Sequence, residues 1–223
     1  MQEINWDPKR EQPLELPDAT IYYYPNFLSS SNATALFQKL HDSIPWQHDP
    51  ITVFGKTYMQ PRLTSLHGTT ATSYTYSDVT MTPQPMTAEL NTILTDIHAV
   101  YTHEFNVVLL NLYRDGKDSN GWHADNEKSL GPKPVIASVS LGEERFFHFK
   151  HRDHKTERYK LRLAHGSLLI MADAMQEKWL HQIAKTNRPI GPRINLTFRK
   201  LIGTPDWGFQ QVEHLPEANV LER

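Results

Sequence analysis

The pattern of hydrophobic and polar positions predicts two helices in the first half of the chain and short strands in the second half. A helix is predicted after the serines at 29–31, where apolar residues share one helical face until Pro45 ends the pattern. A second apolar stripe predicts a helix over 86–102. Between the two helices, residues 51–85 hold short alternating runs divided by Gly and Pro, which predicts hairpins.

From Phe105 onward the hydrophobic period is two, as in strands. Alternation predicts strands at 105–113, 135–141, 145–150, 158–163, 167–171 and 193–201. Several short strands separated by turns are typical of a sandwich or barrel of jelly-roll type. Residues 1–25 are rich in Pro and polar residues, and we expect them to wrap the surface. The sequence contains no internal repeat or low-complexity linker, so one domain is predicted, mainly β with an α+β N-terminal part.

Composition narrows the chemistry that the chain can perform. Hydrophobic residues make up 39% and charged residues 22%, which is ordinary for a soluble globular protein. No apolar run approaches the roughly 18–20 residues of a transmembrane helix, and the polar start has no secretory pattern, so a cytoplasmic protein without membrane contact is expected. Cysteine is absent, so any metal site must use histidine and carboxylate ligands.

Two histidines and one carboxylate stand in a pattern that suits a metal. His123 and Asp125 are separated by one residue, so on an extended segment their side chains project to the same side. His181, beyond two of the predicted strands, would supply the third ligand from a distant strand. Such a set leaves coordination positions of iron(II) open for a co-substrate and dioxygen. Zinc is the chemical rival, because the same ligands suit a hydrolytic zinc site.

The segment 193–199 favours iron over zinc. Its polar and apolar residues occupy opposite faces of a strand: Arg193, Asn195, Thr197 and Arg199 against Ile194, Leu196 and Phe198. Two guanidinium groups on one face suit a dicarboxylate, because the planar fork of Arg pairs with carboxylates bidentately. Asn111 and Tyr113 alternate on an earlier strand and could hydrogen-bond an organic acid. A zinc hydrolase needs no arginine pair, so the pattern indicates an iron(II)- and 2-oxoglutarate-dependent oxygenase.

Charge is distributed unevenly, although the formal net charge is only -2. Basic residues outnumber acidic ones over 145–162: Arg145, Lys150, Arg152, Lys155, Arg158, Lys160 and Arg162 against Asp153 and Glu157. The basic side chains of this segment could contact the phosphate groups of a nucleic acid. A solvated hairpin is the alternative, since a charge run is usually a solvated face.

Over about residues 50–202 the chain resembles the AlkB-type nucleic-acid dealkylating dioxygenases. The resemblance rests on the segment 111–127, which includes Asn-Leu-Tyr and His-Ala-Asp, and on the Arg-x-Asn-x-Thr-x-Arg signature at 193–199. Segments 53–62, 74–77 and 163–168 are most similar to the homologues that repair duplex DNA. The resemblance implies a double-stranded β-helix (jelly-roll) catalytic core at 105–202. It also implies an N-terminal extension with helices and a hairpin nucleotide-recognition lid at about 1–104, and a tail at 203–223.

The resemblance further implies a reaction and its residues. Iron(II) would be held by His123, Asp125 and His181. The co-substrate 2-oxoglutarate would be bound by Arg193 and Arg199, with help from Asn111, Tyr113, Asn195 and Thr197. With dioxygen, the enzyme would remove the N-methyl group of 1-methyladenine or 3-methylcytosine and release formaldehyde, succinate and carbon dioxide.

A methyl group on the Watson–Crick edge is inaccessible in a stacked duplex, so the damaged base must be flipped into a pocket. By resemblance, Tyr76 would stack on the flipped base opposite His123, and Tyr74 would line the pocket. Phe54 would fill the gap that the base leaves in the duplex. Aromatic stacking of this kind is worth about 1–3 kcal/mol per base. Further candidates for contacts to nucleic acid are Gly55, Lys56, Arg62 and the segment 145–162.

One position departs from the family pattern. After the metal-binding Asp, the duplex-repair homologues carry a second acid that contacts the exocyclic amine of the base, whereas this chain has Asn126 followed by Glu127. An Asn side chain can accept a hydrogen bond but has no charge to favour a cationic base. We therefore expect weaker discrimination in favour of charged lesions.

Two other functions stay open at this stage. The same chemistry could act on RNA or protein, which the wedge-like Phe54 argues against. A catalytically silent DNA-damage or metal-binding module would bind DNA without forming succinate, and the intact triad and arginine pair count against it. The expected state is a monomer that acts on alkylated DNA, with the base flipped out of a duplex.

Overall fold

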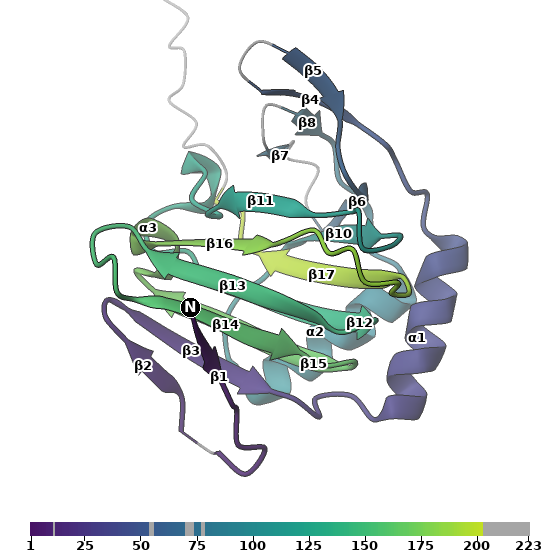
Figure 1. The fold of residues 1–223 in the computed structure, drawn as a ribbon. Coiled ribbons are helices and arrows are strands. Elements are labelled where there is room, and N and C mark those ends of the chain that lie inside the picture. The colour runs from purple at the N-terminus through teal and green to yellow at the C-terminus, as the bar shows by residue number, and fades with distance from the viewer. Residues whose placement is uncertain (11, 54–55, 70–73, 77–78, 203–223) are drawn as a thin grey trace, which may run out of the picture.

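The computed structural model describes residues 1–10, 12–53, 56–69, 74–76 and 79–202. Two β-sheets face each other, and two helices cover the outer side of the larger one (Figure 1). The larger sheet has eight strands in the order β2-β3-β15-β12-β17-β10-β6-β9. Their bounds are, in that order, Leu14–Leu16, Ala19–Tyr24, Ser167–Asp173, Ile136–Gly142, Arg193–Arg199, Val107–Tyr113, Leu63–Gly68 and Gln84–Pro85.

The smaller sheet has five strands in the order β1-β14-β13-β16-β11. Their bounds are Gln2–Ile4, Arg158–Leu163, Arg145–His151, Trp179–Ile183 and Asn120–His123. Pairing in both sheets is antiparallel, except that β1 runs parallel to β14 and β9 parallel to β6. This double-layered arrangement confirms the jelly-roll prediction.

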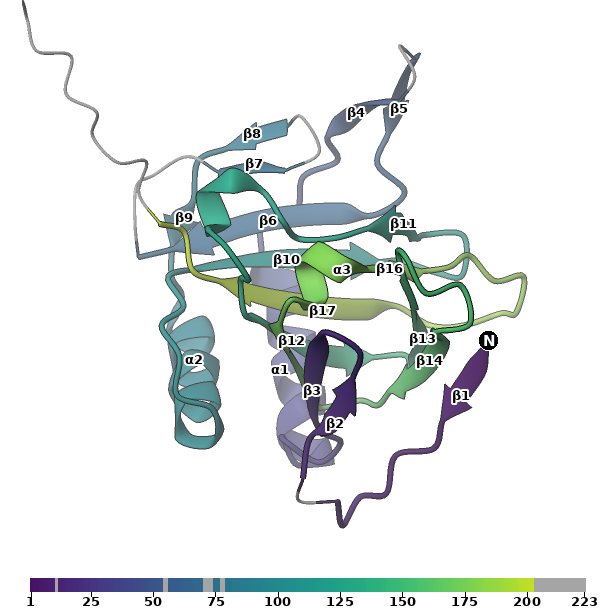
Figure 2. The same ribbon diagram turned by 90° about the vertical axis from the view of Figure 1, so that its left-hand side faces the viewer.

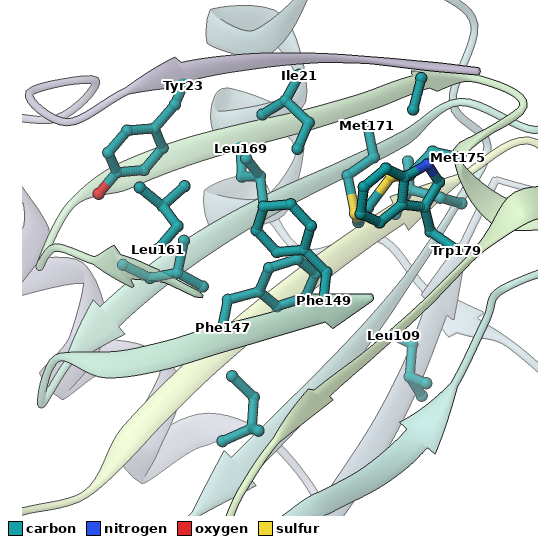
Figure 3. Close-up of a cluster of buried hydrophobic side chains, with 14 of the residues drawn as sticks. Ile21, Tyr23, Leu109, Phe147, Phe149, Leu161, Leu169, Met171, Met175 and Trp179 are labelled. Atoms are coloured by element: carbon teal, nitrogen blue, oxygen red, sulfur yellow. The ribbon is translucent and has the colours of Figure 1, made fainter. Parts of the chain in front are cut away.

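The two facing sheets enclose one hydrophobic core. Phe149 and Trp179 from the smaller sheet meet Ile21 and Leu169 from the larger one, and all four side chains are almost completely buried (Figure 3). The indole nitrogen of Trp179 donates a hydrogen bond to the carbonyl oxygen of Pro17 at 2.9 Å, so its polar atom is satisfied at the edge of the core. The core therefore fixes the distance between the sheets, and with it the shape of any pocket between them.

Helices α1 (Ser30–Ser43) and α2 (Ala88–Val100) occur where the apolar stripes predicted them. Ser29 caps α1, because its hydroxyl oxygen accepts a hydrogen bond from the backbone N–H of Asn32, and Thr87 caps α2 in the same way. The buried faces of both helices pack on the outer side of the larger sheet, away from the inter-sheet core. The helices thus close one face of the sheet and leave its other face for the site.

Two short hairpins lie outside the sandwich. They are β4 (Pro50–Val53) with β5 (Lys56–Met59), and β7 (Tyr74–Tyr76) with β8 (Val79–Met81). Figures 1 and 2 show both hairpins on the same side of the body as β11. The hairpin prediction for residues 51–85 is confirmed where these strands are described.

The expectation for residues 1–25 was wrong. Instead of only wrapping the surface, this segment contributes β1, β2 and β3, and β3 lies inside the larger sheet between β2 and β15. Ile21 is completely buried, and the Tyr23 hydroxyl accepts a hydrogen bond from the backbone N–H of Ala164 at 2.9 Å. The N-terminal segment is therefore a structural part of the core.

Candidate active site

The three predicted metal ligands come together at one end of the sandwich. His123 is the last residue of β11 and is registered opposite His181 on the neighbouring β16. Their imidazole rings lie 4.3 Å apart between centroids, and the Oδ1 atom of Asp125 lies 3.9 Å from the Nε2 atom of His123. The potential ligand atoms of all three residues lie within 4.8 Å of one another. This geometry suits a shared metal ion with one face left open.

A backbone contact sets the orientation of the His123 ring. Its Nδ1 atom lies 2.7 Å from the carbonyl oxygen of Gly121, and only a protonated nitrogen can donate to a carbonyl. The proton therefore resides on Nδ1, and Nε2 presents a lone pair. This contact to the second nitrogen is the usual way in which a protein orients a metal-binding histidine. The side-chain amide of Asn120 donates to Nε2 at 3.0 Å.

Asp125 is buried and kept ionised by an arginine. Its Oδ2 atom lies 3.0 Å from the Nη2 atom of Arg199, and both side chains are only 3% exposed. Burial by itself would raise the pKa of Asp125, but the charge of Arg199 lowers the pKa to about 2. The second oxygen, Oδ1, is buried without a hydrogen-bond partner among the described residues. A charged acceptor left in this state fits a cation between Asp125 and the histidines.

His181 is available as a neutral ligand. Burial is the main cause that lowers the pKa of His181 to about 3. Burial also lowers the pKa of His123. Both imidazoles are therefore uncharged at neutral pH, which is the form that binds metal. The donor set and its protonation state fit the iron(II) that was predicted.

The pocket beside the three ligands is walled by the polar face of β17. Its lining contains all nine residues predicted to hold the metal and 2-oxoglutarate: Asn111, Tyr113, His123, Asp125, His181, Arg193, Asn195, Thr197 and Arg199. The opposite face of β17 packs against the helices through Ile194, Leu196 and Phe198. The predicted alternation of 193–199 is thus confirmed. The pocket also has an apolar wall that includes Leu109, Phe147 and Met171.

Arg193 stands at the end of β17 remote from Arg199 and is 1% exposed. Its Nη2 atom donates to the hydroxyl oxygen of Ser140 at 2.9 Å, whereas Nε and Nη1 are buried without a hydrogen-bond partner among the described residues. Burial lowers the pKa of Arg193 to about 10, so the guanidinium still carries its charge at neutral pH. A buried cation with two unused donors suits a carboxylate of 2-oxoglutarate.

Asn111 and Arg62 form a buried pair. The Nε atom of Arg62 donates to the Oδ1 atom of Asn111 at 2.7 Å, so the amide nitrogen of Asn111 is the group that remains to donate to an organic acid. Arg62 is 3% exposed. The bond to Arg62 also orients the Asn111 side chain. A contact of Arg62 with phosphate, and thereby with the nucleic acid, stays a prediction.

Asn195 and Thr197 bond mainly to each other and to β12. Thr197 donates to the Oδ1 atom of Asn195 at 2.9 Å, and the amide of Asn195 donates to the hydroxyl oxygen of Ser138 at 2.8 Å. Ser138 and Ser140, which hold Asn195 and Arg193, were not predicted as functional residues. Their alternation on the strand Ile136–Gly142 is a signal from which a second polar wall could have been found.

The basic segment 145–162 forms the hairpin of β13 and β14. Arg145 is only 5% exposed, and its guanidinium donates to the carbonyl oxygens of Asp115, Asp118 and Ala184. A phosphate contact from Arg145 was therefore a wrong expectation. Lys160 pairs with Glu3 at 2.7 Å and Arg162 with Glu144 at 3.7 Å, so part of the remaining charge is compensated locally. Phosphate contacts by the other basic residues stay a prediction.

Five predicted substrate contacts fall in or beside parts of the chain that the structure leaves undescribed. Phe54 and Gly55 lie outside the described residues. Lys56 begins β5, and Tyr74 and Tyr76 are the end residues of β7. Asn126 is exposed and directly follows the buried Asp125, while Glu127 is half-buried where a short 3-10 helix (Lys128–Leu130) begins. Their roles toward a base stay predictions.

A second cluster with metal-binding residue types lies near the turn after β13. It consists of Asp18, His151 and His154. The Nδ1 atom of His151 accepts hydrogen bonds from the backbone N–H groups of Asp153 and His154, so the ring proton must reside on Nε2, which faces Asp18 at 3.4 Å. A protonated nitrogen cannot bind a metal. This cluster therefore stabilises the turn.

Comparisons with known proteins agree with the site. A family model described as the 2OG-Fe(II) oxygenase superfamily matches residues 20–199. The chain belongs to this superfamily. Iron(II) and 2-oxoglutarate, which give the superfamily its name, are thus its cofactors, and it is a dioxygenase, as predicted. Among the described residues, no helix has the length and apolarity needed to cross a membrane.

Relatives place the chain among the AlkB homologues of this superfamily. Alpha-ketoglutarate-dependent dioxygenase alkB homolog 3 of Mus musculus is 40% identical over 191 residues, which cover 82% of this chain and 66% of the relative. The chain therefore spans just under two thirds of that relative's length. DNA oxidative demethylase ALKBH2 of Mus musculus is 36% identical over 191 residues, covering 81% of this chain and 80% of the relative. The predicted resemblance is confirmed.

Solved structures show the same fold at low identity. The structure of OsALKBH1 has a TM-score of 0.59 at 16% identity and covers 81% of this chain and 97% of that chain. A 2OG-Fe(II) oxygenase from Burkholderia pseudomallei has a TM-score of 0.52 at 12% identity and covers 80% of this chain and 84% of that chain. The architecture is thus shared with proteins that are only 12–16% identical to this chain.

Proposed function

We propose that this dioxygenase repairs DNA by oxidative demethylation of N-alkylated bases, with 1-methyladenine and 3-methylcytosine as substrates. Formaldehyde, succinate and carbon dioxide would be the products. One observation carries the proposal: the three metal ligands and the two arginines of β17 line one pocket. The similarity to proteins named alkB homolog 3 and DNA oxidative demethylase ALKBH2 supports the choice of nucleic acid as substrate.

The chain's own residues prepare the site for this chemistry. His123, Asp125 and His181 would hold iron(II), which with 2-oxoglutarate and dioxygen supplies the oxidant for the N-methyl carbon. The Gly121 carbonyl holds the His123 ring, and Arg199 keeps Asp125 ionised. Arg193 and Arg199 both line this pocket, so each can meet one carboxylate of the dianion.

Water exclusion and proton control follow from burial. The pocket has an apolar wall, in which the ring of Phe147 lies 5.1 Å from that of His181. Low local polarity strengthens the pairing of a dianion with buried guanidinium groups. Because both imidazoles are neutral and Asp125 is ionised, no ligand must lose a proton when metal binds at neutral pH.

The damaged base would reach the pocket from the side where the hairpins lie. Base flipping is required, and we propose that Tyr76 stacks on the base, Tyr74 lines the pocket and Phe54 fills the gap in the duplex. Both hairpins and β11 lie on the same side of the body, which is consistent with this route (Figure 2). Duplex preference, a monomeric state and a cytoplasmic location belong to the proposal as predictions.

Anaerobic loading with iron(II) and 2-oxoglutarate, followed by air, tests the proposal on a duplex oligonucleotide with one 3-methylcytosine. Mass spectrometry should show loss of the methyl group, and the loss should disappear in His123→Ala. An RNA strand carrying the same lesion and the variant Phe54→Ala test the substrate class. If the methyl group is lost only from RNA, and Phe54→Ala is as active as the wild type, the substrate is RNA rather than DNA.

Two further outcomes separate the remaining alternatives. Succinate formation without demethylation keeps the oxygenase and rejects these lesions as its substrates. DNA binding without succinate would instead support a catalytically silent damage-binding module. The intact triad and both arginines argue for turnover.

A further inference from the structure

The backbone of Asp125 lies just beyond the hydrogen-bonded part of β11. Pairing of β11 with β16 ends at His123 and His181, so Asp125 has no strand partner in the part of the chain that the structure describes. Its buried backbone N–H instead donates to the Oε1 atom of Gln176 at 2.9 Å. A buried backbone donor needs a partner, and here a side chain distant in sequence provides it.

The side chain that makes this contact, Gln176, lies in the protein core. It belongs to the four-residue helix α3 (Met175–Lys178) between β15 and β16, and it is completely buried. Its amide nitrogen points toward the sulfur of Met171 at 3.7 Å, which leaves the oxygen for Asp125. Only the oxygen of an amide can accept a hydrogen bond, so the side-chain orientation is determined.

Helix α3 is itself held from two sides. The backbone N–H of Ala174, its capping residue, donates to the carbonyl oxygen of Asp18 at 3.0 Å. The carboxylate of Glu177 accepts a hydrogen bond from the backbone N–H of Lys133 at 3.2 Å. Gln176 therefore presents its oxygen from a fixed position.

Asp125 needs such a fixed point because Arg199 competes for its carboxylate. Arg199 bonds Oδ2, and Oδ1 faces His123. If the backbone could shift, the planar guanidinium could take both oxygens in a bidentate pair, which would withdraw the carboxylate from the metal side. The contact at the backbone prevents this shift without using either carboxylate oxygen.

We infer that Gln176 is a positioning residue for the metal centre, which holds the backbone of Asp125 so that one carboxylate oxygen stays directed toward the two histidines. This inference rests on the proposed ligand roles of His123, Asp125 and His181. It requires no assumption about the nucleic-acid substrate. Partners that orient metal ligands typically change metal affinity by about 10–100-fold when removed.

Cobalt(II) binding to the purified full chain tests the inference without turnover. Gln176→Met keeps the volume and removes the acceptor, and we expect its cobalt(II) affinity to fall about 10-fold or more, with a changed visible absorption spectrum. Gln176→Glu keeps an acceptor oxygen at the same reach and should restore affinity to within about threefold of the wild type, well below the loss typical of a missing partner. Gln60→Met is the matched control, because Gln60 is a second buried glutamine and lies between β5 and β6.

Wild-type affinity and spectrum in Gln176→Met would overturn the inference, as would an equal loss in Gln60→Met. If Gln176→Met does not fold, Gln176→Asn replaces it, since its shorter side chain withdraws the same acceptor. His181→Ala tests the ligand assignment separately from the role of Gln176. If this variant binds cobalt(II) as the wild type does, the ligand assignment fails rather than the role of Gln176.

Discussion

Replacing Arg199 by Met tests the electrostatic basis of the site. The substitution keeps an unbranched side chain but removes the cation 3.0 Å from Asp125. Lowering the pKa of Asp125 from its usual 3.8 to about 2 corresponds to about 2.4 kcal/mol, at ~1.36 kcal/mol per pKa unit. Without Arg199, burial would dominate and leave an uncompensated charge. We expect the free energy of unfolding of the metal-free protein to fall by about 3–5 kcal/mol at pH 7.

The pH dependence has a definite sign. A carboxyl group with a lowered folded-state pKa contributes stability above its unfolded pKa, and that contribution disappears as the pH falls from 3.8 toward 2. The difference between wild type and Arg199→Met should therefore be largest near neutral pH and become smaller toward pH 3. A divalent metal compensates the same carboxylate, so saturating manganese(II) should recover part of the lost stability.

Urea unfolding with and without manganese(II), between pH 3 and 7, measures each of these effects. Arg162→Met is the matched control, because Arg162 pairs with Glu144 at 3.7 Å while both side chains are about half exposed. This surface pair should contribute at most about 1 kcal/mol. The reasoning would be refuted if Arg199→Met lowered the free energy of unfolding by no more than Arg162→Met does. It would also be refuted if the decrease caused by Arg199→Met did not depend on pH.

Three further substitutions test other parts of the site. Arg193→Met should raise the KM for 2-oxoglutarate about 10–100-fold in succinate assays, because charge-assisted hydrogen bonds are lost, while cobalt(II) affinity stays unchanged. Arg145→Met should lower the free energy of unfolding by about 2–4 kcal/mol in urea, because three carbonyl contacts are lost. The affinity of this variant for undamaged DNA should equal that of the wild type. A weaker affinity at unchanged stability would show that Arg145 does contact phosphate. Asn126→Asp should raise the preference for 3-methylcytosine over a neutral etheno adduct about fivefold, the effect of roughly 1 kcal/mol of added charge interaction, and an unchanged ratio in competition assays would contradict this.

Alternation along β17 was sufficient to predict both of its faces, because the polar face meets the pocket and the apolar face meets the helices. The strand β3 was missed for a physical reason. Its aromatic run lies between Pro17 and Pro25, and the prolines indicated an irregular segment. Strand β16 carries alternately buried residues, but its histidine and glutamine hid the pattern, so it was not delimited although His181 was identified.

Burial of charged side chains could not be predicted from local sequence. Arg62 and Arg145 occur in polar or basic surroundings, where exposure is the ordinary expectation. Their actual partners are Asn111 and the carbonyl groups at 115, 118 and 184, which are distant in sequence. Gln176 likewise gains its role only through a contact across 51 positions of the chain. Such roles depend on tertiary packing, which a single sequence does not reveal.

Strand β11 is the edge strand of the smaller sheet, and it is registered with β16 at only two positions. One of them is the pair His123 and His181. A metal bound by both imidazoles would cross-link the two strands at the end of their short pairing. Metal uptake would then be a local folding step, and its loss would let β11 open before the rest of the sandwich. Protease resistance around residues 115–127 would accordingly report metal occupancy even when no substrate is present.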